Sequence, residues 1–250
     1  MKVWEPCDFE FYDFRGEWVL DYELKPLIGV VGKPKDTAER FKYILVNDQI
    51  KRLILESGGL VIGILPLDSQ YKLSGNPNAY ELIDSEARDL ESVVDRVSGV
   101  VLQGGLCSNG YEQHIARVCL KEDKPLLGIC CGFDNMLRAV GNELVLDESG
   151  LHWNYEAPRV HDIVIDESSL LYSILKRRRV AVNSIHQVII KKDDVKNCFV
   201  SAVCPDDSTA CAIEFGDKRF ALGVKFHPEL MRDGCFDKIF EAFVLACKGC

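Results

Sequence analysis

The stretch Pro125-Leu126-Leu127-Gly128-Ile129-Cys130-Cys131-Gly132-Phe133-Asp134 combines a short apolar run, a sharp turn and the start of a helix. Cys130 stands at the turn with a glycine two positions to either side, which is the thiol version of a nucleophile elbow. Because a helix would begin directly after the sulfur, its unpaired N–H groups would favour a thiolate and any oxyanion formed beside it. The alternative is a small buried cysteine without chemistry, since Cys is a common core residue. This pattern alone leaves both interpretations open.

A second motif, Gly223-Val224-Lys225-Phe226-His227-Pro228-Glu229, ends another short apolar run in His-Pro-Glu. His227 would take the thiol proton, and Glu229 would hold the imidazole in the required tautomer. Pro228 fixes the turn between them, so both side chains can point to the same end of a sheet. The two motifs together predict a catalytic triad of Cys130, His227 and Glu229.

The combined motifs resemble those of the class I glutamine amidotransferase-like superfamily. Other segments resemble its γ-glutamyl hydrolase branch, typified by γ-glutamyl-γ-aminobutyrate hydrolase. They are Leu27–Val31, Ser57-Gly58-Gly59 before Leu65-Pro66, Val182–Gln187, and Ala212–Glu214 before Phe220–Gly223. The resemblance covers residues 26–248. It implies amide hydrolysis through a thioester, a small γ-glutamyl or ω-amide substrate, and no cofactor.

The order of apolar and amphipathic segments predicts an α/β fold. A mostly parallel central sheet would be flanked by helices in three layers, flavodoxin-like, with a smaller antiparallel β extension. The expected strands are 27–32, 60–65, 99–103 and the apolar run before Cys130, then 161–166, 179–186, 188–192, 198–204 and 210–215. The expected helices are 41–57, 80–96, 111–121 and 236–246. Residues 26–250 would form one catalytic domain, and residues 1–25 an extension that covers a sheet edge, closes over the site or mediates a homodimer.

Four further residues complete the site that the resemblance implies. Backbone N–H groups of Cys131 and of Gly105, in a glycine turn after the third strand, would bind the oxyanion. Asp134 stands where class I enzymes usually carry Gln; its carboxylate would repel a substrate carboxylate, or it is only a first-turn charge favoured by the helix dipole. His186 matches a histidine of the hydrolase branch and would either touch the leaving group or be structural. The Cys131 side chain is expected to be inert.

Composition excludes several other classes of protein. The net charge of −9, from 39 acidic and 30 basic residues, argues against nucleic-acid binding. No apolar run approaches the ~20 residues of a membrane span. Eleven cysteines without an export signal predict reduced thiols in the cytoplasm, and Cys247 with Cys250 would lie in a frayed tail. The five histidines show no metal-ligand spacing, so no metal is expected.

Three functions remain open at this point. The first is a free-standing cysteine hydrolase that cleaves a γ-glutamyl amide or related ω-amide. The second is a glutaminase subunit that supplies ammonia to a synthase partner. The third is a catalytically silent binding protein of the same fold, because fold alone does not decide function.

Overall fold

The computed structural model describes residues 24–36, 42–66, 84–105, 110–153, 161–231 and 234–249. The roles expected for the N-terminal extension, and the place of Cys250, fall outside these ranges. Within them, no helix is both long enough and apolar enough to cross a membrane.

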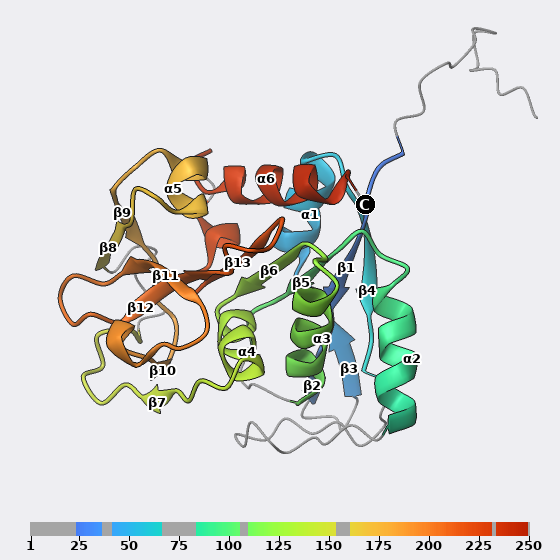
Figure 1. Cartoon of the computed structure of the whole chain (residues 1–250), viewed down its shortest axis with the longest axis horizontal. Helices are drawn as coiled ribbons and strands as arrows, with labels where there is room; N and C mark the ends of the chain where they lie inside the picture. The colour runs from blue at the N-terminus through green and yellow to red at the C-terminus, as the bar shows by residue number, and fades with distance from the viewer. Residues whose placement is uncertain are drawn as a thin grey trace, which may run out of the picture.

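Nine strands of the described residues form one sheet in the order β4-β1-β5-β6-β13-β12-β11-β8-β9 (Figure 1). The first five are parallel, and from β12 onward each strand pairs antiparallel with its neighbour. Their bounds are β1 Leu27–Val31, β4 Leu60–Ile64, β5 Gly99–Leu102, β6 Leu126–Ile129, β8 His161–Ile165, β9 Arg179–Val182, β11 Phe199–Val203, β12 Ala210–Glu214 and β13 Ala221–Val224. The predicted α/β class and its antiparallel extension are confirmed.

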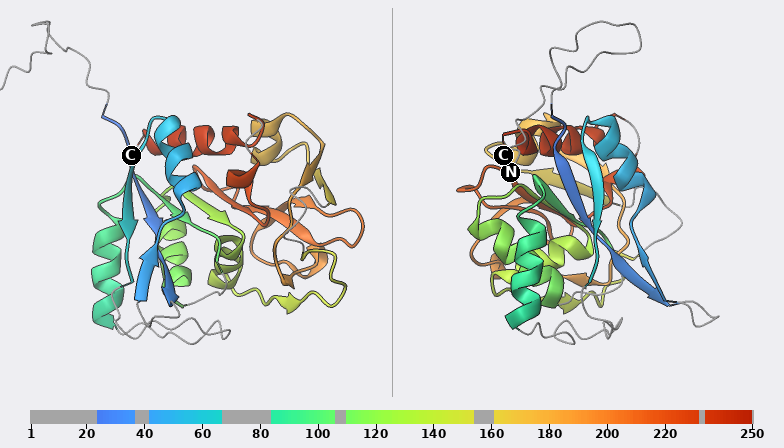
Figure 2. Two further views of the ribbon diagram at one scale, coloured as in Figure 1. Left: turned by 180° about the vertical axis from the view of Figure 1, so that it is seen from behind. Right: turned by 90° about the vertical axis from the view of Figure 1, so that its right-hand side faces the viewer.

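Helices cover both faces of this sheet (Figures 1 and 2). One face packs against α1 (Asp48–Glu56), α5 (Leu170–Leu175) and α6 (Asp237–Cys247), and the other against α2 (Asp84–Val94), α3 (Gly110–Lys121) and α4 (Cys131–Ala139). Alternate residues of one strand enter different cores: Val30 faces the first set of helices and Val31 the second. A parallel sheet buried on both faces explains the continuous apolar runs in the sequence.

The predicted helix over 41–57 is wrong in its first half. Lys42–Leu45 forms strand β3, which pairs antiparallel with β2 (Lys33–Asp36). The helix begins only at Asp48, because the Asn47 side chain accepts hydrogen bonds from the N–H groups of Gln49 and Ile50 and caps the first turn.

Two further expectations need correction. The predicted strand 179–186 ends at Val182, and that over 188–192 shrinks to β10 (Val188–Ile189), which pairs with β7 (Val145–Leu146). Cys247 is not in a frayed tail: it is buried at the end of α6, against Gly99.

The contact between α4 and β5 yields a stability prediction. A β-carbon added to Gly132 would lie 2.0 Å from the Leu102 carbonyl oxygen, so the helix would have to move. We expect Gly132→Ala to lower the free energy of unfolding by about 1–3 kcal/mol, the usual range for overpacking. Urea denaturation measures the change. Gly216→Ala is the matched control, because an added β-carbon there meets no atom within 4 Å; equal effects of the two substitutions would contradict the packing argument.

Candidate active site

Three neighbouring parallel strands end side by side at the site. Gly104 and Gly105 follow β5, Cys130 follows β6, and His227 lies just beyond β13. The Cys130 N–H donates a hydrogen bond of 2.8 Å to the Val224 carbonyl, which extends the β6–β13 pairing to the turn. The predicted convergence at the carboxyl ends of the strands is therefore present.

Cys130 has the backbone of a nucleophile elbow. Its φ of 52° and ψ of −106° lie outside the ordinary regions for a side-chain-bearing residue, and α4 begins at the next residue. Such a conformation costs about 1–3 kcal/mol and persists only where the surroundings impose it. The strain presents the sulfur at the strand edge, beside the start of a helix.

The two glycines after β5 have different neighbours. A β-carbon on Gly104 would lie 2.6 Å from the Cε1 atom of His227 and 3.5 Å from the Cβ atom of Cys130. A β-carbon on Gly105 would instead approach the aliphatic part of Lys33 at 3.1 Å. Gly104, which sequence reasoning did not select, is therefore the glycine packed against the nucleophile and the base, with Gly105 directly beyond it.

His227 is held on both its side chain and its backbone. Its Nδ1 atom lies 2.7 Å from Oε1 of the buried Glu229, so the ring donates to the carboxylate and leaves Nε2 for the thiol. The side chain of Asn183 accepts from the His227 N–H and donates to the His227 carbonyl, both at 2.8 Å. Glu229 and Asn183 thus fix the tautomer and the position of the imidazole.

Electrostatics favour a thiolate–imidazolium pair. Burial works to raise the pKa of Cys130, but the His227 charge and hydrogen bond, with the Lys225 charge, outweigh it and lower the pKa below 9.0. Burial works to lower the pKa of His227, but Cys130 and Glu229 outweigh it and hold the pKa well above 6.5. Proton transfer from sulfur to nitrogen therefore charges both groups together.

The Asp134 carboxylate is neither exposed to solvent nor an unpaired charge. It is buried in the first turn of α4 and forms an ion pair with the buried Lys225 ammonium, which also lies 5.6 Å from the centre of the Phe133 ring. Burial raises the pKa of Asp134, and Lys225 opposes that rise. The expectation that Asp134 would repel a substrate carboxylate loses its basis, because Lys225 offsets its charge.

A second buried ion pair lies behind Cys131. Lys33 Nζ donates to both carboxylate oxygens of Glu112, at 2.5 and 2.6 Å, and to Cys131 Sγ at 3.5 Å. Asn135 donates to the same carboxylate at 2.6 Å. Burial raises the pKa of Cys131, so its thiol stays protonated. The inert side chain expected at that position stays a prediction.

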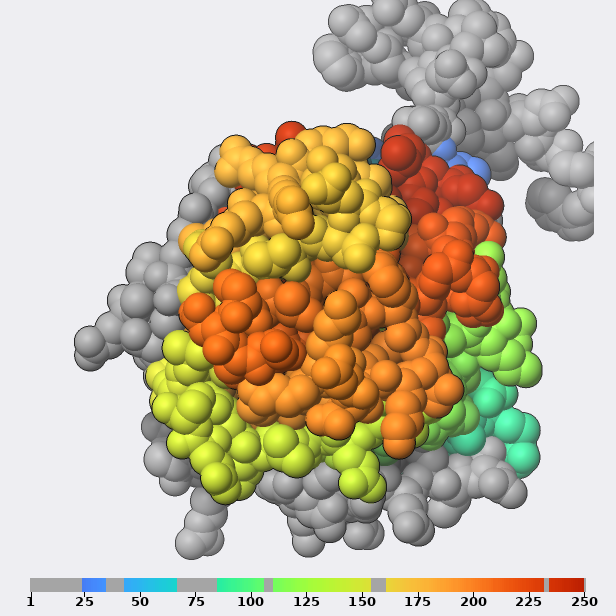
Figure 3. All heavy atoms as spheres, turned by 60° about the vertical axis from the view of Figure 1, so that its left-hand side comes forward, coloured from blue at the N-terminus to red at the C-terminus, as the bar shows by residue number. Residues whose placement is uncertain are grey.

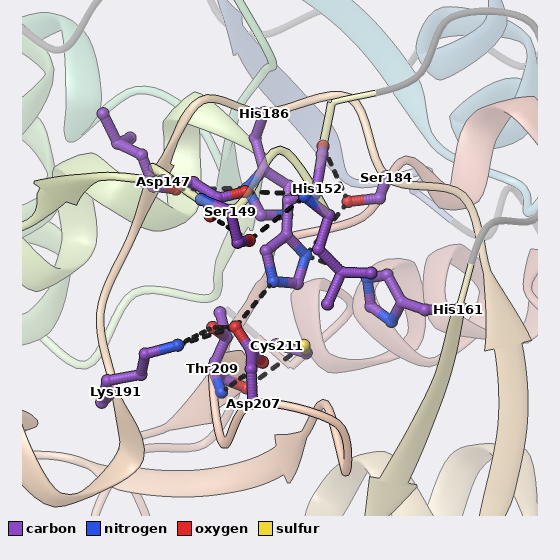
Figure 4. Close-up of polar contacts among 12 residues, drawn as sticks. Asp147, Ser149, His152, His161, Ser184, His186, Lys191, Asp207, Thr209 and Cys211 are labelled. Carbon is purple, nitrogen blue, oxygen red and sulfur yellow. Dashed lines mark hydrogen bonds and ion pairs between the residues drawn. The ribbon is translucent and has the colours of Figure 1, made fainter.

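His186 lies in a cluster of three histidines (Figure 4). Its ring stacks on His152 with centroids 4.8 Å apart, and His152 Nδ1 lies 3.3 Å from His161 Nε2. The preceding residue, Ile185, has its carbonyl oxygen 3.9 Å from Cys130 Sγ. Sequence spacing gave no sign of this grouping, because the three residues come from separate segments that only the fold brings together.

Several residues of the site escaped the sequence analysis. Lys225 offered a signal, since it is a charged residue inside an apolar motif. Asn183 belongs to a segment that carried the family resemblance, and Lys33 directly follows the first strand. Their partners Asp134, Glu112 and His227 lie far away in sequence, so no local pattern shows the contacts.

Several known proteins are similar to this chain. The family model for Peptidase C26 matches residues 107–229. CTP synthase of Salinibacter ruber is 24% identical over 90% of this chain, which spans only 45% of that protein's length. The glutamine-hydrolyzing GMP synthase subunit of Methanothermobacter thermautotrophicus is 24% identical over 64% of this chain and 80% of its own length. The glutaminase domain of Trypanosoma brucei CTPS, solved with bound acivicin, superposes with a TM-score of 0.62 at 18% identity, over 88% of this chain and 94% of that domain.

The thiolate pair yields a pH prediction. Since the pKa of Cys130 is lowered below 9.0, its alkylation by iodoacetamide should extend to lower pH than that of an ordinary thiol and fall as pH drops through the lowered pKa. Cys198, whose pKa burial raises to about 11, should react only in more alkaline solution. His227→Ala should move the Cys130 profile to higher pH. Peptide mapping by mass spectrometry measures the extent of alkylation at each cysteine. If the pH profiles of Cys130 and Cys198 overlap, the Cys130 thiol is not activated.

The Asp134–Lys225 pair yields a stability prediction. Asp134→Asn leaves a buried ammonium without its counter-charge, so we expect a loss of about 3–5 kcal/mol in the free energy of unfolding. The double variant Asp134→Leu with Lys225→Met should recover most of that loss, because a buried pair can be replaced by apolar groups at little cost. Asp162→Asn, which breaks the exposed pair with Arg179, is the control. The midpoints of urea denaturation compare the stabilities of these variants. A double variant no more stable than Asp134→Asn would show that the two charges do not act as a pair.

Proposed function

We propose that the chain is a cysteine-dependent glutaminase of the class I glutamine amidotransferase-like superfamily that supplies ammonia to a synthase partner. The observation that carries the proposal is Cys130 at the elbow beside His227, whose ring is oriented by Glu229. The lowered pKa of the thiol is the property that a nucleophile requires.

The geometry supports a two-step reaction. The Cys130 thiolate attacks the side-chain amide carbon of glutamine, and the C–N bond of the resulting tetrahedral species breaks as His227 gives its proton to the leaving ammonia. A water molecule, deprotonated by His227, then attacks the thioester. The C–S bond breaks, glutamate leaves and the thiolate is restored.

Two backbone donors are proposed for the oxyanion of both tetrahedral species. The Cys131 N–H opens α4 directly after the nucleophile, and the Gly105 N–H belongs to the turn beside it. Donors at a helix start need no reorganisation when charge develops, which is why such sites lower the barrier. The Lys225 ammonium offsets the Asp134 carboxylate, which reduces the repulsion that Asp134 would exert on a substrate carboxylate.

Glutamine is favoured over other γ-glutamyl amides by the relatives. CTP synthase and the glutamine-hydrolyzing GMP synthase subunit both match this chain, and the latter is a separate polypeptide of which the chain covers 80%. This supports the partnered glutaminase over the free-standing γ-glutamyl hydrolase that the sequence analysis put first. The Peptidase C26 match over residues 107–229 supports the hydrolase as the second candidate.

Acivicin provides a test that needs no partner. We expect it to modify Cys130 and spare Cys198, and glutamine to protect Cys130 at lower concentration than γ-glutamyl-γ-aminobutyrate does. His227→Ala should slow the labelling by about 10²–10⁴-fold, the usual contribution of a general base. Cys130→Ser should abolish it, and Cys198→Ser, which alters a partly buried cysteine outside the site, is the matched control.

Release assays on the purified protein then separate the functions. Glutamate and ammonia formed from glutamine support the proposal. Better protection and faster turnover with γ-glutamyl amides would replace it with the second candidate. Labelling spread over several cysteines, with no protection by either compound, would leave the silent binding protein as the answer.

A further inference from the structure

The histidine cluster, defined as His152, His161 and His186, joins three segments of the antiparallel half. His152 follows β7, His161 begins β8, and His186 lies between β9 and β10. Figure 3 brings the left-hand side of Figure 1 forward. In this view the segments that contain β7, β8–β9 and β11–β12 lie next to one another on the surface. The histidines themselves are only 0%, 7% and 5% exposed. Buried imidazoles need a partner for each ring nitrogen.

One nitrogen of each ring is committed as a donor to an oxygen, and Figure 4 shows the contact between His152 and Asp207. His161 Nδ1 lies 3.0 Å from the Asp162 carbonyl, and His186 Nδ1 lies 3.1 Å from the Val188 carbonyl. His152 Nε2 lies 3.1 Å from Oδ2 of Asp207. Carbonyl and carboxylate oxygens only accept, so these three nitrogens carry the protons. The second nitrogen of each ring is left with a lone pair.

The three rings bring nitrogen atoms close together. His152 Nδ1 lies 3.3 Å from His161 Nε2, and one nitrogen of each of the three rings lies within 4.8 Å of the others. The nearby Ser184 hydroxyl, 3.4 Å from His152 Nδ1, donates instead to the His152 carbonyl at 2.9 Å. Facing lone pairs repel unless a cation lies between them.

A metal ion fits this gap. Two nitrogens bound at ~2.0–2.1 Å to a tetrahedral Zn²⁺ lie about 3.3–3.4 Å apart, which is the His152–His161 separation. The third nitrogen lies within 4.8 Å of the other two and would have to approach them to that range.

We propose that His152, His161 and His186 bind one divalent transition-metal ion, Zn²⁺ by their donor set. Each ligand already has the outer hydrogen bond that orients metal-bound histidines, and Asp207 supplies a carboxylate–histidine–metal arrangement. The fourth position falls to Ser184 or water. Of the nearby ammonium groups, Lys191 is paired with Asp207 and Lys225 with Asp134, so both charges are locally offset.

The ion would also tie the antiparallel half to the nucleophile. His186 directly follows Ile185, whose carbonyl faces Cys130 Sγ. A ligand at residue 186 restrains the backbone that lines one side of the thiol. The role assigned to the ion is therefore to hold this segment in place, and no step of the amide hydrolysis passes through it.

Metal binding is tested on the full chain. We expect one Zn²⁺ per protein after expression, and stoichiometric rebinding to chelator-treated protein in competition with a chromophoric chelator. Zn²⁺ at about 100-fold above its Kd should raise the Tm by about 5–10 °C. His161→Ala should abolish tight binding, and Asp207→Asn should weaken it by about 10–100-fold. His114→Ala is the matched control, because that histidine lies on α3 beside Glu91.

One further variant and a metal substitution distinguish the histidine cluster from a neighbouring set of possible ligands. His152 also lies close to Cys204 and Asp207, which form an alternative ligand set. Cys204→Ser should leave affinity unchanged, and Co²⁺-substituted protein should lack a thiolate charge-transfer band. Loss of binding in Cys204→Ser with retention in His161→Ala would overturn the proposal. So would wild-type protein that binds no Zn²⁺ in the competition assay, a result that does not depend on any variant folding.

Discussion

The parallel register between β6 and β13 is the constraint on which the site depends. Ile129 pairs with Val224, so the next residue of each strand, Cys130 and Lys225, leaves the sheet beside the other. The hydrogen bond from the Cys130 N–H to the Val224 carbonyl continues that pairing into the turn. A one-residue slip would send every side chain beyond the strand ends to the opposite face. The nucleophile, its base and the ion pair beside them are therefore set by one backbone alignment in the most buried part of the sheet.

Buried charge is the second constraint on this site. Lys225–Asp134 and Lys33–Glu112 are both withdrawn from solvent on either side of the Cys130–Cys131 turn. Desolvation makes such pairs weak sources of stability, and apolar residues of similar size often replace them without loss. A role at the site accounts better for their presence. Lys225 lowers the pKa of the Cys130 thiol while Asp134 raises it, so the balance of one pair tunes the nucleophile.

The sequence was informative where the signal is local. Apolar runs located the parallel strands, and the two motifs located Cys130, His227 and Glu229, because a strand end and the turn after it are encoded by neighbouring residues. It was uninformative where the contact depends on topology. The partner of Asp134 is 91 positions away, and the histidine cluster forms only once β8 and the segment after β9 are in place. The β2–β3 hairpin was missed for a related reason, since Lys42–Leu45 is apolar enough to continue the helical pattern that follows it.

The short segment after β9 connects the two halves of the molecule. The predicted strand stops at Val182, and the next residues make specific contacts in place of ladder hydrogen bonds. Asn183 clamps the backbone of His227, Ile185 places its carbonyl near Cys130 Sγ, and His186 enters the histidine cluster. The antiparallel extension is thus more than an edge added to a parallel sheet. Residues 183–186 thus contact the base, the nucleophile and the histidine cluster within four consecutive positions.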